Sequence, residues 1–137
     1  FAMPFRIHYC ASKAATSMLS YGLKMELSDA KIDVTAICPG DVKTNFMKSR
    51  IKNFATNEKY GARVQNAQDL VDSNNSKRMT VDYVANVIYK IANKKRMKAM
   101  YIVGRKYKVF NFLLHLFPVN TFLKVSNKLF GGRKKIN

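Results

Sequence analysis

The chain has 137 residues, which suits one modest domain, and its 25 Lys and Arg against 8 Asp and Glu give a formal net charge of +17. The last acidic residue is Asp82, so every charged side chain after it is Lys or Arg. A solvated basic surface or an attraction to anionic lipid would account for this charge. No nucleic-acid-binding motif accompanies the charge, so we expect no nucleic-acid partner.

The two cysteines, Cys10 and Cys38, have neither a Cys-x-x-Cys partner nor neighbouring His-rich spacing, which argues against a metal site. A disulfide between them would need their Cα atoms within about 7 Å of each other. We therefore expect two buried free thiols, no bound metal, and a reducing, cytoplasmic compartment.

Residues 9–28 are predicted to form one helix, which carries Tyr9 and Lys13 four positions apart. Positions i and i+4 lie on one helix face, with Cβ atoms about 6 Å apart. A phenol is a weak base at neutral pH, and a neighbouring cation stabilises its phenolate form. The pair is therefore a candidate acid/base for an alcohol oxygen, the alternative being an ordinary surface pair.

The segment 32–38 is apolar and β-branched, which predicts a strand covered on both faces, and Pro39 and Gly40 end it. A helix, a strand and then a loop form half of a βαβ unit. In open α/β sheets, ligands bind beyond the carboxyl ends of the strands, which is where residues 39–44 are expected to lie.

Residues 8–15 and 37–44, with the helix and strand between them, resemble the C-terminal half of a short-chain dehydrogenase/reductase. The resemblance covers residues 1 to about 46. It implies an α/β fold, the C-terminal part of a doubly wound, Rossmann-type parallel sheet truncated at its N-terminus. Residues 1–104 are then the C-terminal half of an NAD(P)-binding domain, and residues 105–137 are a basic amphipathic helical extension.

The resemblance also implies an activity, namely hydride transfer between NAD or NADP and an alcohol/carbonyl substrate. Tyr9 would donate or accept the proton, and Lys13 would assist it and bind the nicotinamide ribose. The family's glycine-rich turn, Asn-Ala-Gly segment and catalytic Ser are not found in this sequence. We therefore expect the chain to be a fragment that is inactive alone.

The turn after the strand is expected, by the same resemblance, to bind the cofactor. Pro39 and Gly40 would shape the turn beside the nicotinamide, while the Val42 backbone and the Thr44 hydroxyl would contact its carboxamide and a nearby phosphate. The polar segment 45–76 corresponds to the family's substrate-closing segment.

Two short helices are predicted within that segment, near 45–54 and 60–72. Phe46 is a candidate substrate-binding residue, and ordinary packing is an equally good interpretation of it.

Thr80 is predicted to cap a helix that ends in a basic cluster. The core-facing stripe of that helix is expected to comprise Val84, Val87, Ile88 and Ile91. Residues 100–103 are predicted to be the last strand, with Gly104 ending it.

The tail has an apolar run at 109–117, a break at Pro118, and a second apolar stripe at 122–130. Neither run reaches the roughly 20 apolar residues that a membrane span needs. An amphipathic helical hairpin is therefore expected, docked either on protein or on a membrane surface. In the second case the chain would be a non-catalytic basic module that associates with anionic membranes. His115 is expected to be packed.

The expected partners are a small-molecule carbonyl or alcohol substrate, a second copy of the chain, and possible membrane lipid. The resemblance places the homo-oligomer contact on the helix at 9–28, where Ala11, Ala15, Met18 and Gly22 would permit close packing.

Overall fold

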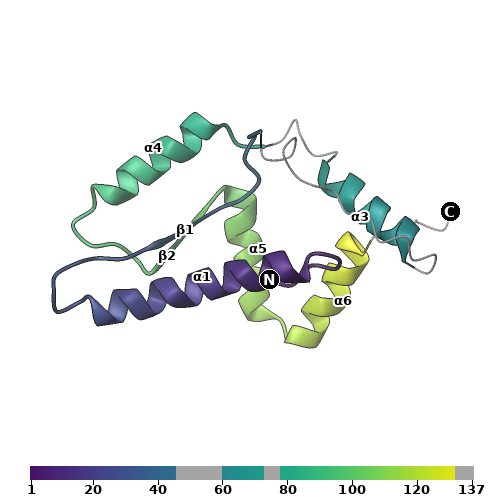
Figure 1. The fold of residues 1–137 in the computed structure, drawn as a ribbon, viewed down its shortest axis with the longest axis horizontal. Coiled ribbons are helices and arrows are strands. Elements are labelled where there is room, and N and C mark those ends of the chain that lie inside the picture. The colour runs from purple at the N-terminus through teal and green to yellow at the C-terminus, as the bar shows by residue number, and fades with distance from the viewer. Residues whose placement is uncertain (46–59, 73–77, 132–137) are drawn as a thin grey trace.

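The computed structural model describes residues 1–45, 60–72 and 78–131 (Figure 1). Its elements are α1 (Ile7–Glu26), β1 (Ala36–Pro39), α3 (Gly61–Asp72), α4 (Val81–Ala92), β2 (Met100–Val103), α5 (Arg105–Leu116) and α6 (Val119–Phe130). The two strands pair in parallel, with Ala36 opposite Met100 and Pro39 opposite Val103. The fold is therefore α/β with a small parallel sheet, as predicted, and it is consistent with part of a Rossmann-type sheet.

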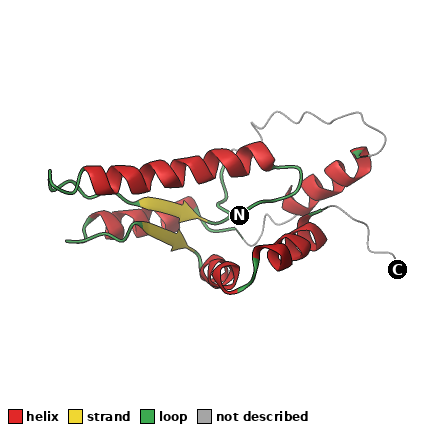
Figure 2. Cartoon of the chain, turned by 90° about the horizontal axis from the view of Figure 1, so that it is seen from below, coloured by secondary structure: helices red, strands yellow, loops and turns green. Residues whose placement is uncertain are grey.

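The sheet lies between α1 and α4 in Figure 1. Figure 2 shows α1 running along the strands, whereas the hairpin of α5 and α6 lies beyond their carboxyl ends. The described core is small, and its buried apolar residues include Ala36 of β1 and Val103 of β2. This arrangement leaves large parts of α1 and α5 exposed.

β1 starts later than the sequence predicts, because side chains rather than ladder hydrogen bonds hold the residues before it. The Asp33 carboxylate pairs with Lys24 of α1 and accepts a 2.7 Å hydrogen bond from the Met97 backbone N–H. The Thr35 hydroxyl donates to the Lys98 carbonyl at 2.7 Å. These contacts join the end of α1 to the segment that leads into β2.

α4 begins as predicted, with the Thr80 hydroxyl accepting a hydrogen bond from the Tyr83 backbone N–H at 3.2 Å. Val84 and Ile91 are buried, two turns apart on one face. Ile88 was wrongly predicted to belong to this core. It lies at the margin of the buried face and remains 42% exposed.

The inner side of the α5–α6 hairpin packs on the first residues of the chain. The Phe1 ring centre lies 4.8 Å from that of Phe110 and 5.7 Å from that of Phe122, in edge-to-face arrangements. Ser126, which is 2% exposed, donates a 2.9 Å hydrogen bond to the Ala2 carbonyl. The hairpin therefore docks on its own chain through one of its two sides.

The other side of the hairpin is exposed. His115 lies there, so the expectation that it is packed was wrong. Its Nδ1 atom is 2.7 Å from the Asn111 carbonyl oxygen one turn earlier in α5. Of the helices in the described ranges, none has the length and apolar character needed to cross a bilayer.

We expect Asp33→Asn to lower the Tm of the intact protein at pH 7. The hydrogen bond from Lys24, with that from the Met97 N–H, lowers the pKa of Asp33. A lowered pKa in the folded state stabilises the protein above the unfolded-state pKa, and the stabilisation disappears as pH falls through the folded-state pKa. Thermal unfolding followed by circular dichroism should show a Tm difference at pH 7 that narrows in acid, below about pH 3.9.

Asp29→Asn is the matched control, because Asp29 is an exposed carboxylate in the turn that follows α1. This substitution should leave the Tm unchanged. Equal Tm losses in the two variants would show that the Asp33 contacts contribute nothing specific.

Candidate active site

Tyr9 and Lys13 lie on the same face of α1, as their spacing predicts. The Lys13 Nζ atom is 5.7 Å from the centre of the Tyr9 ring, within the range of a cation–π contact. Both side chains are exposed in the described structure. The helix thus presents a phenol and an ammonium together, where a ligand can reach both.

The Pro39–Gly40 turn lies at the carboxyl end of β1. Pro39 is the last residue of the strand, a position that tolerates the missing N–H of proline. The Gly40 N–H donates to the Val103 carbonyl of β2 at 3.2 Å, which holds the turn against the neighbouring strand. The turn therefore occupies the edge of the sheet where open α/β folds bind ligands.

The ring of Tyr107, from the first turn of α5, lies against the glycines that follow both strands. A Cβ atom on Gly40 would overlap the ring. Gly104 has φ of 102°, and a Cβ there would lie 2.8 Å from Tyr107 Cδ2. Each strand is therefore followed by a glycine, because the Tyr107 ring fills the space that a side chain at position 40 or 104 would need.

The Tyr107 hydroxyl also ties this ring to Asp41, the residue after the turn. It donates to Asp41 Oδ2 at 2.6 Å and accepts from the Asp41 N–H at 2.9 Å. Lys106 Nζ lies 3.9 Å from the same carboxylate oxygen. A side-chain hydrogen bond with Tyr107, helped by the charge of Asp41, raises the pKa of Lys106.

The residues after Asp41 are held beside the start of α4. Val42 forms an isolated parallel bridge with Met79, whose carbonyl accepts from the Lys43 N–H at 2.9 Å. The Met79 N–H donates to the Asp41 carbonyl at 3.0 Å. Thr44 follows with an exposed side chain. The predicted substrate residue Phe46 and the predicted helix at 45–54 lie outside the described residues.

The structure thus groups the predicted site residues in two places. Tyr9 and Lys13 share one helix face, and the residues from Pro39 to Thr44 form one turn at the sheet edge. Sequence reasoning missed Tyr107 and its bond to Asp41. The sequence did hold a signal for this contact: each predicted strand is followed by a glycine, and Tyr107 comes three residues after the second of them, Gly104.

Cys10 and Cys38 are free thiols, as predicted, but both are partly exposed rather than buried. Partial burial in β1 raises the pKa of Cys38, which disfavours its thiolate. Within residues 1–45, 60–72 and 78–131, no group of three or more His, Cys, Asp or Glu side chains could hold a metal ion.

Gly40→Ala is expected to destabilise the intact protein by about 1–3 kcal/mol, because its Cβ would displace the Tyr107 ring from a filled space. The free energy of unfolding, measured with urea, checks this. The control is a double-mutant cycle with Tyr107→Ala, which removes the ring. In that background Gly40→Ala should cost little. An undiminished cost there would show that the ring is not the reason for glycine.

The short chain dehydrogenase family matches residues 1–54 of this chain. The chain is 28% identical over 135 residues to the Probable short-chain type dehydrogenase/reductase VdlC of Helicobacter pylori, covering 98% of this chain and 50% of that protein. It is 31% identical over 103 residues to Dehydrogenase/reductase SDR family member 7B of Xenopus tropicalis, covering 75% of this chain and 30% of the relative.

A third similar protein, the Uncharacterized oxidoreductase YusZ of Bacillus subtilis, is 27% identical over 125 residues, which cover 88% of this chain and 45% of that protein. The chain therefore spans half or less of the length of these relatives. The family match, these relatives and the parallel α/β fold agree: the chain belongs to the short-chain dehydrogenase/reductase family.

Proposed function

We propose that the intact protein is an NAD- or NADP-dependent oxidoreductase that interconverts an alcohol and a carbonyl compound. The observation that carries this proposal is the position of the Lys13 ammonium, 5.7 Å from the centre of the Tyr9 ring on an exposed helix face. A family match that includes both residues supports it. A bound nicotinamide would supply or accept the hydride.

Tyr9 is proposed to donate a proton to the carbonyl oxygen during reduction and to take it back during oxidation. The Lys13 ammonium stabilises negative charge that develops on the phenol oxygen, and it can also donate hydrogen bonds to ribose hydroxyls. The donor chemistry on this face of α1 therefore suits a nicotinamide nucleoside.

The turn from Pro39 to Thr44 is proposed to bind the nicotinamide end of the cofactor. Its backbone is already held by β2 through Gly40, by α5 through Asp41, and by Met79 through Lys43. A preorganised turn loses little conformational freedom when a ligand binds, which favours affinity. Val42 and Thr44 would supply the backbone and hydroxyl contacts to the carboxamide and phosphate.

The exposed small-residue face of α1 is proposed to pack against a second copy of the chain. This face carries Ala11, Ala15, Met18 and Gly22, and a Cβ added at Gly22 would meet nothing within 4 Å. Met18 is 63% exposed.

Tyr9→Phe is expected to lower turnover of the intact enzyme by about 10²–10⁴-fold, the usual contribution of general acid–base catalysis. Phenylalanine keeps the ring beside Lys13, so cofactor affinity should be unchanged. Turnover can be followed by nicotinamide absorbance against a panel of ketones, aldehydes and alcohols, with cofactor affinity measured by calorimetry. Lys13→Ala should weaken both cofactor binding and turnover.

Tyr89→Phe is the control for that experiment, because Tyr89 is an exposed tyrosine of α4 that is not among the candidate site residues. It should retain normal turnover. Wild-type turnover in Tyr9→Phe would refute the role assigned to the phenol.

Met18→Glu is expected to convert the proposed dimer of the intact protein into monomers, because it places a charge in a contact between closely packed helices. Sedimentation velocity over a range of concentrations measures this. Tyr89→Glu adds the same charge to exposed surface on α4 and should leave the dimer intact. A dimer that survives Met18→Glu would place the contact elsewhere.

A further inference from the structure

α5 has two apolar faces, of which only one is used within the described chain. The inner face carries Phe110, which packs against Phe1 and Phe122. The opposite face carries apolar side chains at positions i, i+3, i+4 and i+7, namely Val109, Phe112, Leu113 and Leu116. These four side chains are between 39% and 66% exposed. A stripe of this spacing is normally buried.

The turn between α5 and α6 extends this exposed surface. Phe117 and Val119, on either side of Pro118, are both exposed. We call the six side chains the outer apolar surface: Val109, Phe112, Leu113, Leu116, Phe117 and Val119. They run from the second turn of α5, through the turn at Pro118, to the first residue of α6.

The charged side chains of α5 and α6 are all positive, although one of them, Lys106, lies 3.9 Å from the Asp41 carboxylate. The sequence has no acidic residue after Asp82, and the two hairpin helices carry five exposed cations: Arg105, Lys106, Lys108, Lys124 and Lys128. A second copy of the hairpin would bring like charges together, which disfavours self-association at this face. Anionic lipid headgroups would instead complement the cations while the acyl region receives the apolar side chains.

We propose that the outer apolar surface docks on the surface of a membrane that contains anionic lipid. α5 lies in the plane of the interface, with its bulky apolar side chains below the headgroups and its cations among them. The inner face stays packed on the chain, where the Phe1–Phe110–Phe122 cluster and the Tyr107–Asp41 bonds hold it. This role goes beyond the proposed hydride transfer and does not depend on it.

The first test uses the fluorescence of an introduced tryptophan, read as the difference from the intact protein without the substitution; residues 1–137 contain no tryptophan. In the intact protein, Leu116→Trp should emit as an exposed indole in buffer and shift to shorter wavelength with vesicles of phosphatidylcholine and phosphatidylglycerol. Pure phosphatidylcholine should give a much smaller shift, and added salt should weaken binding to the anionic vesicles. Tyr89→Trp, on exposed α4 surface, should not respond to either vesicle.

The second test compares two charge-matched double variants by vesicle co-sedimentation. Phe112→Glu with Leu116→Glu should reduce partitioning onto anionic vesicles about tenfold or more, because two apolar anchors become anions. Val81→Glu with Tyr89→Glu changes two exposed apolar residues of α4, alters the net charge equally, and should retain most of the binding.

Three outcomes would overturn the proposal. The first is that the wild-type protein fails to bind anionic vesicles at low salt. The second is that the two double variants bind these vesicles equally. The third is that Leu116→Trp already emits at short wavelength in buffer and that vesicles do not change this emission. That result would mean that protein, from the same or a second copy, covers the outer apolar surface. If the Phe112→Glu, Leu116→Glu double variant loses its circular dichroism signal, the Leu116→Trp experiment still decides.

Discussion

The packing of the Tyr107 ring on Gly40 and Gly104, the residues that follow the two strands, fixes the carboxyl end of the sheet. It joins β1, β2 and α5, because the ring lies against Gly40 and Gly104 while its hydroxyl makes two hydrogen bonds to Asp41. A side chain at Gly40 would exclude the ring. Glycine at position 40 therefore leaves the space that the Tyr107 ring occupies.

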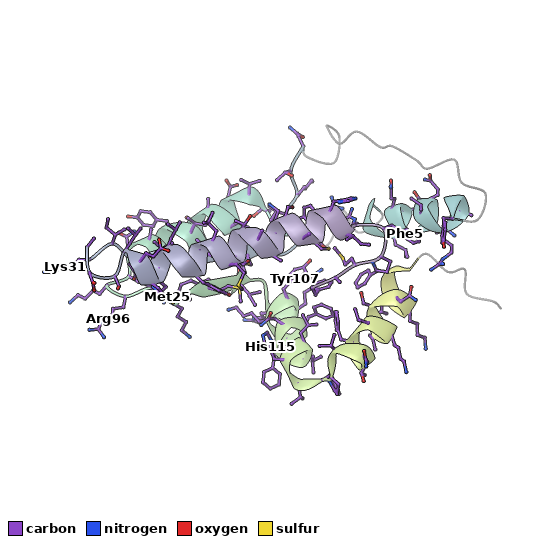
Figure 3. All side chains as sticks on the ribbon, turned by 60° about the horizontal axis from the view of Figure 1, so that its bottom comes forward. Phe5, Met25, Lys31, Arg96, Tyr107 and His115 are labelled. Carbon is purple, nitrogen blue, oxygen red and sulfur yellow. The ribbon has the colours of Figure 1, made fainter. Side chains whose placement is uncertain are left out.

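This contact also relates the two proposed roles of the chain. Figure 3 shows Tyr107 at the end of α5 nearest α1, with His115 farther along the same helix. α5 has 12 residues, so its length is about 18 Å at 1.5 Å per residue. One short helix thus begins at the turn proposed to bind nicotinamide and ends at the surface proposed to contact lipid. The orientation of the Pro39–Thr44 turn is therefore linked, through α5, to the orientation of the outer apolar surface.

Local sequence signals predicted much of this fold. The i, i+4 spacing placed Lys13 beside Tyr9, Thr80 capped α4, and Gly104 ended β2, because each feature depends on a few neighbouring residues. The start of β1 and the exposure of Ile88 were predicted wrongly. The start of β1 depends on contacts between distant segments, such as Asp33 with Met97, which periodicity does not report.

The candidate site, too, has residues that the sequence predicted and one that it did not. The motif residues could be found from their order in the sequence, whereas Tyr107 lies 66 positions after Asp41 and reaches it only through the parallel pairing of β1 and β2. Apolar patterning likewise predicted an amphipathic tail but could not separate the two apolar faces of α5. Only the packing of Phe110 on Phe1 identifies which face is already occupied.

Side-chain size and charge are the reasons for proposing different partners for the two exposed apolar surfaces. The face of α1 is built from the small residues Ala11, Ala15 and Gly22. Such a surface lets another helix approach closely but offers little bulk to a fluid bilayer. The face of α5 has bulky side chains such as Phe112 and Leu116 within a cationic surround. Bulk and positive charge together favour an anionic lipid interface over a second protein helix.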